Sequence, residues 1–109
     1  MGKRERTKGH GYEREVARMF RRWFPEARRQ QEYHESDCLG VDLQGTDCLS
    51  VQCKRFKGYA PISALDEVQP KRGQFPLLLT RGDRLPDRVV MGWPLFEFLM
   101  DQAFCTEES

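Results

Sequence analysis

The run Phe75–Thr80 is the part of the sequence that most restricts what this chain can fold into. It reads F-P-L-L-L-T, a nearly continuous apolar stretch that is typical of a short strand buried inside a sheet. The glycine, proline and aspartates of Gly82–Asp87 then predict a turn, and Arg88–Trp93 follows as a second short strand. A chain of 109 residues has room for one core, so these strands should lie at the centre of a single domain.

Apolar residues at helical spacing precede and follow these two strands. The segment Gly11–Phe24 carries a stripe that predicts a helix ended by Pro25, and its members are Tyr12, Val16, Met19, Phe20, Trp23 and Phe24. Pro94 suits the start of a last helix, one side of which carries Leu95, Phe98, Leu99 and Gln102 or Ala103. Ser63–Val68 resembles a short helix start with Ser63 as its cap.

The middle of the chain predicts further strands. Val41–Gln44 and Cys48–Phe56 are strand-like, and the turn residues Gly45–Asp47 between them predict a β-hairpin. Ala27–Tyr33 is a candidate polar edge strand. The expected order is α-β-β-β-α-β-β-α, an α/β fold with a mixed central sheet flanked by helices. We expect one domain over residues 1–109, with a flexible basic arm at 1–7 and a disordered tail at 104–109.

Charge is unevenly distributed along the chain, although the net charge is only +1. Basic residues outnumber acids in the first third, whereas the segment 101–109 has acids and no base. The basic segment favours a polyanionic partner, nucleic acid or a membrane surface, or else it is a solvated helix face. No apolar run approaches the roughly 20 residues that span a bilayer, so we expect a soluble, cytoplasmic protein.

The strand-like run Leu49–Phe56 suggests chemistry, because side chains alternate between the two faces of a strand. The alternation places Leu49, Val51 and Cys53 toward the core and Ser50, Gln52 and Lys54 on the opposite face. The hairpin should bring Asp42 close to Gln52 and Lys54. Such a group of oxygens suits Mg²⁺, with Mn²⁺ as a substitute. The backbone carbonyl of Cys53 and the carboxylate of Glu13 on the first helix are candidate further ligands.

These groups define a possible reaction. Bound Mg²⁺ would polarise a phosphoryl oxygen and lower the pKa of a water. Lys54 would then orient or deprotonate that water, or stabilise the charge that develops on the phosphate. The alternative for the same residues is plain surface chemistry, since Asp at a hairpin start and Lys near a strand end are common. The four cysteines are expected to be free thiols, and a zinc site of His34, Cys38, Cys48 and Cys53 is the less favoured alternative.

Three motifs together resemble a known family. They are K-G-x-x-x-E-R-E at Lys8–Glu15, G-V-D-L at Gly40–Leu43 and V-Q-C-K at Val51–Lys54. In combination they are similar to the archaeal-type Holliday junction resolvases of the PD-(D/E)XK nuclease superfamily, and to phage proteins of similar size. The resemblance implies a restriction-endonuclease-like fold. It also implies a Mg²⁺-dependent endodeoxyribonuclease, acting as a homodimer on four-way DNA junctions.

The resemblance implies a role for individual residues as well. Glu13, Asp42 and Gln52 would hold the metal, Lys54 would be the catalytic lysine, and Gln52 stands where the family usually has Glu. The residues that it implies for DNA binding are Lys8, Arg14, Arg28, Arg29, Ser36, Arg55 and Lys57. Because an amide is a poorer Mg²⁺ ligand than a carboxylate, two alternatives stay open. They are another nuclease on this fold, for repair or restriction, and a junction-binding module without catalysis.

Two interpretations also stay open for the apolar C-terminal region. The strand Phe75–Leu79 and the last helix, with Trp93, Phe96 and Phe98, would supply the face of a homodimer, or they would fill the core of the monomer. The second is expected here, because a domain this small needs its apolar residues inside.

Overall fold

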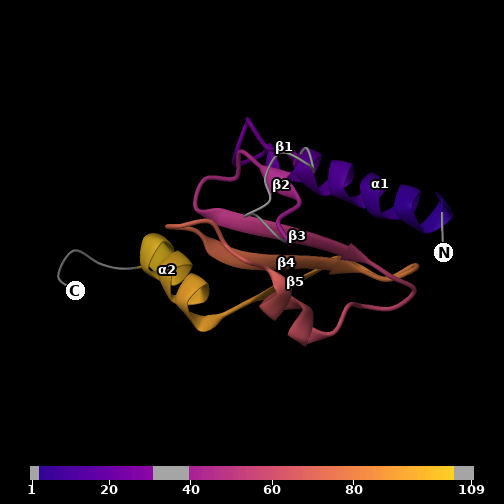
Figure 1. The fold of residues 1–109 in the computed structure, drawn as a ribbon. Coiled ribbons are helices and arrows are strands. Elements are labelled where there is room, and N and C mark those ends of the chain that lie inside the picture. Colours follow the sequence, from indigo (N-terminus) through magenta and orange to yellow (C-terminus); the bar gives the residue numbers. More distant parts are fainter. Residues whose placement is uncertain (1–2, 31–39, 105–109) are drawn as a thin grey trace.

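A mixed three-stranded sheet forms the centre of the computed structural model, which describes residues 3–30 and 40–104, with side chains described from residue 11 (Figure 1). Strand β3 (Leu49–Arg55) runs parallel to β4 (Phe75–Arg81), and β5 (Arg88–Met91) runs antiparallel to β4. Strands β1 (Arg28–Arg29) and β2 (Leu43–Gln44) form a separate antiparallel pair. The α/β fold with a mixed sheet flanked by helices is therefore confirmed.

Each face of the sheet has its own cover. Helix α1 (Lys3–Phe20) packs on one face, in a core of Tyr12, Val16, Ala17, Phe20, Ala27, Leu43, Val51, Cys53, Leu77, Leu79 and Leu95. The 3-10 helix η2 (Ile62–Glu67) covers the other face, where Ala60, Ala64 and Leu78 are buried together. The predicted alternation along β3 is thereby confirmed, with Val51 and Cys53 in the α1 core.

Helix α1 differs from the prediction at both ends. It begins at Lys3, so Lys3–Thr7, where the sequence predicted an arm, is helical; these residues are mostly good helix formers. It ends at Phe20, followed by a turn in which Trp23 and Phe24 both donate to the Phe20 carbonyl. Pro25 disfavours helical geometry at Phe24, the residue before it, so the chain cannot continue as a helix beyond this turn.

The apolar stripe of α1 is only partly buried. Tyr12, Val16 and Phe20 lie in the core as expected, but the expectation is wrong for Met19 and for Trp23, which is 61% exposed. The helix ends before Trp23, so that residue no longer follows the helical phase. The arginines at 14, 18, 21 and 22 are exposed, as the stripe predicts.

The predicted β-hairpin is wrong in its pairing. Gly45–Asp47 is a turn, with positive φ at Gly45 and Asp47, but β2 pairs with β1 and not with β3. One backbone bond joins the two segments, from the Asp42 N–H to the Val51 carbonyl (2.7 Å). At the next bonding position the Cys53 N–H donates to the Asp42 side chain, at 2.8 Å, so a carboxylate stands where a ladder would place a carbonyl.

The helix expected at Ser63–Val68 is a 3-10 helix over Ile62–Glu67, and Ser63 is not its cap. Pro61 holds the capping position, and no side chain caps the N-terminus. The strand expected over Arg88–Trp93 ends at Met91, since Trp93 already begins α2 (Trp93–Phe104), with Pro94 in its first turn. Within the described residues, no helix has the length and apolar character to cross a membrane.

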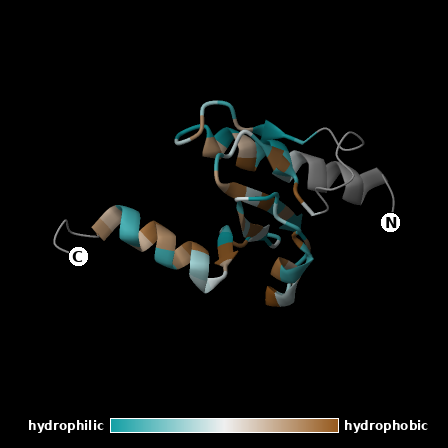
Figure 2. Cartoon of the chain, turned by 60° about the vertical axis from the view of Figure 1, so that its left-hand side comes forward, coloured by the Kyte–Doolittle hydropathy of each residue, from teal (hydrophilic) through white to brown (hydrophobic). Residues whose placement is uncertain are grey.

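The last helix does not fill the core of the monomer. Leu95 is its single buried residue, whereas Trp93 is 67% exposed and Phe96 and Phe98 are also exposed. Figure 2 shows α2 projecting away from the body of the chain. The interpretation of this helix as monomer core is therefore wrong for these aromatic residues, while β4, with Leu77, Leu78 and Leu79 buried, does lie in the core.

Candidate functional site at the free edge of strand β3

Asp42 lies beside the edge of β3 that does not face β4, and it makes three hydrogen bonds with backbone groups, two of them with β3. Its N–H donates to Val51, its carbonyl accepts from the Gln30 N–H at 2.8 Å, and its Oδ2 accepts from the Cys53 N–H. In a strand, the N–H and carbonyl of one residue point to the same side. The carbonyl of Cys53 therefore belongs to the same edge as the Asp42 carboxylate.

The Asp42 carboxyl has an unusual affinity for protons. Burial raises its pKa from 3.8 to about 7, although the bond from the Cys53 N–H favours the ionised form. The charge of Glu13 raises the pKa further, and those of Lys54 and Arg29 lower it. The charges of Glu13, Lys54 and Arg29 therefore all act on the Asp42 carboxyl. Two of these residues, Glu13 and Lys54, are predicted catalytic partners of Asp42.

Glu13 reaches this site from α1, where it forms an ion pair with Arg29. The Arg29 Nε donates to Glu13 Oε1 at 2.9 Å, and both side chains are less than one quarter exposed. A partly buried pair of this kind is costly to break, because the remaining charge stays without a counterion. Arg29, which the resemblance assigns to DNA, is therefore engaged inside the protein by Glu13.

Gln52 and Lys54 share the η2 side of β3, but their contacts differ. Gln52 is 6% exposed, and its Oε1 is buried with no hydrogen-bond partner among the described residues. Its Nε2 lies beside Gly40, only 3.3 Å from where a Cβ at that position would be. The Lys54 Nζ lies 3.6 Å from Glu67 Oε1, and the Glu67 side chain is 63% exposed, so this pair is weak.

The donor set at this edge fits a hard divalent cation in part. Mg²⁺ is commonly held by one or two carboxylates plus waters, and Asp42, Glu13, the Cys53 carbonyl and the orphaned Gln52 Oε1 are oxygen donors of that type. However, no group of three or more His, Cys, Asp and Glu gathers anywhere in the described part of the chain. Position 52 is an amide, so the carboxylates among the predicted ligands are only those of Asp42 and Glu13.

The residues implied for DNA binding are scattered around this site. Arg14, Arg28 and Lys57 are exposed; the Arg28 Nη1 donates to the Glu26 carbonyl at 3.0 Å. Arg55 forms an ion pair with Asp83 at 3.3 Å. The side chain of Lys8, and Ser36 altogether, lie outside what the structure describes.

The alternative zinc site can be examined at two of its four residues. Cys53 is buried in the α1 core, and burial raises the pKa of its thiol well above the ordinary value. A thiol must lose its proton to bind zinc, so this environment disfavours coordination. Cys48 and Cys53 are free, as expected, while His34 and Cys38 lie outside the described residues.

A cluster around Arg81 was not foreseen from the sequence. The Arg81 guanidinium bonds both oxygens of Glu15 (2.8 and 3.0 Å) and both oxygens of Asp87 (2.9 and 3.0 Å). The buried Tyr12 donates its hydroxyl to Asp87 at 2.9 Å, and the Arg81 guanidinium lies over its ring. We call the group of Arg81, Glu15, Asp87 and Tyr12 the clasp. Tyr12 and Glu15 flank Glu13, so the clasp holds the part of α1 that carries Glu13 against β4.

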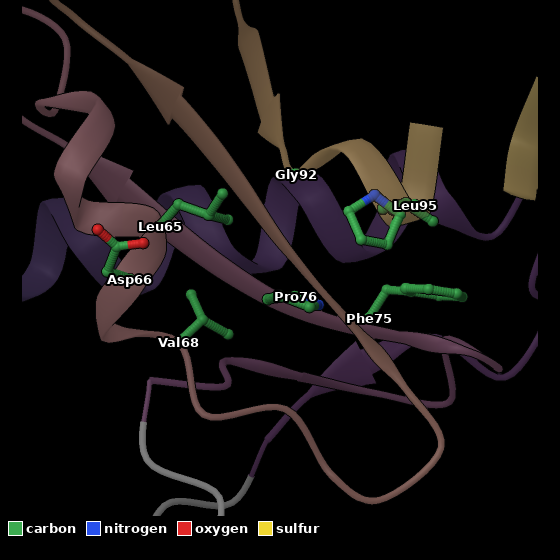
Figure 3. Close-up of a pocket in the computed structure, with 8 residues that line it drawn as sticks. Leu65, Asp66, Val68, Phe75, Pro76, Gly92 and Leu95 are labelled. Carbon is green, nitrogen blue, oxygen red and sulfur yellow. The ribbon is translucent and has the colours of Figure 1, made fainter. Parts of the chain in front are cut away.

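The cavity in Figure 3 is separate from this edge. Its volume is about 370 Å³, and it is lined by Leu65, Asp66, Val68, Phe75, Pro76, Gly92, Pro94 and Leu95. None of the predicted metal or catalytic residues lines it. The candidate chemistry therefore belongs to the β3 edge and not to the cavity.

Comparison with known proteins assigns no family: no family model, no curated protein and no solved structure matches this chain.

Proposed function

We propose that this protein is a Mg²⁺-dependent endonuclease of restriction-endonuclease-like fold, which cuts four-way DNA junctions as a homodimer. The observation that carries the proposal is the placement of Asp42. A carboxylate, largely buried, replaces a strand carbonyl at the edge of β3, within electrostatic reach of both Glu13 and Lys54. Perturbed carboxyls beside a lysine are frequent at catalytic sites.

The residues of this edge would have different roles in phosphodiester hydrolysis. Asp42, Glu13, the Gln52 Oε1 and the Cys53 carbonyl would hold Mg²⁺, which supplies a Lewis acid and a bound water of lowered pKa. The ammonium of Lys54 would stabilise the charge that develops on the phosphate oxygens or orient the attacking water. Lys54 is free to do so, because its pair with the exposed Glu67 is long and weak.

The substrate class follows from surface charge and from the motif resemblance. Exposed arginines on α1, among them Arg14 and Arg18, can contact phosphates without reading sequence. The guanidinium of Arg22 lies 5.5 Å from the ring of the exposed Trp23, which adds an aromatic surface at the end of this helix. Junction cleavage needs two symmetric cuts, which a two-fold dimer would supply.

A non-catalytic junction-binding module is the second candidate, and a specific observation favours it. The site has two carboxylates, and one of them, Glu13, already has Arg29 as a counterion at 2.9 Å. Binding a cation there would require the ion pair to loosen. The two candidates make opposite predictions about cleavage and the same prediction about DNA binding.

The test is a cleavage assay on a synthetic four-way junction beside linear duplex of the same sequence, with Mg²⁺, with Mn²⁺ and with chelator. We expect paired symmetric nicks, on the junction and only with metal. The variants Lys54→Ala and Asp42→Asn should lose cleavage and keep junction binding. Lys71→Ala is the matched control, because Lys71 is a partly buried lysine remote from the proposed site residues in the sequence, at the loop before β4.

Each outcome separates the candidates. Metal-dependent cutting of linear duplex as well as junctions would indicate another nuclease on this fold, of the repair or restriction type. Tight binding without cutting in either metal would favour the junction-binding module. Cleavage that persists in Lys54→Ala or Asp42→Asn would overturn the assignment of the site.

A further inference from the structure

Helix α2 is apolar on nearly every side and yet largely uncovered. A helix that is hydrophobic all round is normally buried, but of its twelve residues only Leu95 is buried. The exposed side chains are Trp93 (67%), Phe96 (42%), Phe98 (37%), Leu99 (40%), Met100 (39%) and Phe104 (70%). Figure 2 shows the brown, hydrophobic segments running along the projecting helix.

The helix carries two apolar stripes that point in different directions. The inner stripe contains Leu95, in the core, and Phe98, whose ring lies 5.4 Å from that of Phe75 on β4. With 3.6 residues per turn, the residues Trp93, Phe96, Met100 and Phe104 repeat every three or four positions along the opposite side. We call these four the outer stripe. The rings of Trp93 and Phe96 already pack together, at 5.5 Å between centroids.

Charge decides what kind of partner the outer stripe fits. The described helix carries Glu97 and Asp101 and no basic residue, and both acids are exposed. An acidic, apolar helix is repelled by the phosphates of DNA and by an anionic membrane surface. The outer stripe is therefore suited to another apolar protein surface, and a second copy of the same stripe is one.

The outer stripe supplies about the area that a small interface needs. The exposed fractions of its four side chains amount to a little more than two complete ones, and at roughly 200 Å² each this is about 450 Å² per copy. Two copies would then bury about 900 Å², and the exposed Leu99 on the flank of the stripe raises this toward the roughly 1,000 Å² that a specific interface should clear. The cavity beside the first turn of α2, lined in part by Gly92 and Pro94, adds apolar surface that a second copy can cover (Figure 3).

We infer that α2 is the self-association surface of this protein, and that two copies pack their outer stripes against each other across a two-fold axis. An isologous contact of this kind uses the same patch on both subunits, and antiparallel helices satisfy it. The acids Glu97 and Asp101 stay on the border of the contact, in solvent. The inference rests on the proposed function only for the need of two sites, since the exposed stripe is independent of the chemistry.

The test is the molecular mass of the full chain in solution, measured by sedimentation velocity over a range of protein concentrations. The wild type should sediment as a dimer, at twice the monomer mass of 12.8 kDa. The variant Phe96→Glu/Met100→Glu should sediment as a monomer with an unchanged circular dichroism spectrum. Ile62→Glu is the matched control, because Ile62 is 76% exposed on η2, and it should remain a dimer.

A monomeric wild type at high concentration, or a dimer that survives the double substitution, overturns the inference. A monomer that co-sediments with neutral lipid vesicles would assign the outer stripe to lipid and overturn it as well. Failure of the proposed function gives a different pattern. In that case the wild type is a dimer through α2 but shows no junction cleavage with any metal.

Discussion

Replacing Asp42 by Asn should stabilise the metal-free protein at neutral and alkaline pH. The ordinary pKa of this carboxyl is 3.8, and in the folded protein it is about 7, mainly because of burial. Between these values the folded protein keeps a proton that the unfolded chain has released, so the free energy of unfolding falls as pH rises. Asn carries no charge and can still accept the Cys53 N–H, so its variant avoids this loss.

The magnitude follows from the same pKa. One pKa unit corresponds to about 1.4 kcal/mol, so ionised Asp42 should lower the free energy of unfolding by up to about 4 kcal/mol at pH values above 7. This is a large share of the roughly 5–15 kcal/mol that stabilises an ordinary domain. At acid pH below the ordinary value of 3.8 the difference between Asp42→Asn and the wild type should approach zero.

Urea unfolding in the presence of chelator, at about pH 5 and about pH 8, measures this difference. We expect the advantage of Asp42→Asn over the wild type to grow between the two pH values. Asp66→Asn is the control, because Asp66 is exposed on η2 and its variant should follow the wild type at both pH values. If Asp42→Asn and the wild type differ by the same amount at both, the buried-carboxyl reasoning is refuted.

Three further predictions concern other residues. Arg81→Met should lower the free energy of unfolding by about 2 kcal/mol in urea titrations, because two carboxylates lose a bidentate partner; the exposed Arg72→Met should change it little, and equal effects would show that the clasp contributes nothing. Gln52→Glu should keep or raise cleavage and lower the Mg²⁺ concentration for half-maximal rate, because a carboxylate is the better ligand; complete loss would mean a specific role for the amide. Arg14→Ala should weaken binding to any DNA and reduce the slope of log affinity against log salt by about one, and an unchanged slope would remove Arg14 from the phosphate contacts.

The positions of the main strands and helices could be predicted from local pattern. Phe75–Thr80 is a short apolar run whose exposure to water would be unfavourable, which indicates a buried strand. In the structure β4 occupies Phe75–Arg81. The alternation of β3 placed Val51 and Cys53 in the core and Gln52 and Lys54 on the other face. These features depend on the period of the backbone and on proline, both of which are local properties.

Contacts between distant segments could not be predicted in this way. The pairing of β2 with β1, the ion pair of Glu13 with Arg29 and the clasp of Arg81 with Glu15 each join residues that no local pattern relates. The same holds for α2. Its apolar residues indicate burial. Whether they pack against the core of the same chain depends on the position of the helix relative to the sheet, which the local sequence does not set.

The sequence by itself determined which residues carry the candidate chemistry, since Asp42, Gln52 and Lys54 are identified by type and spacing alone. The tertiary structure decided how they are used. It placed the Asp42 carboxylate on the Cys53 N–H at the free edge of β3, gave Glu13 a counterion, and left the outer stripe of α2 uncovered. Burial and the charges of neighbours depend on the packing of the whole chain, and these set the pKa of a carboxyl and the partner of a helix.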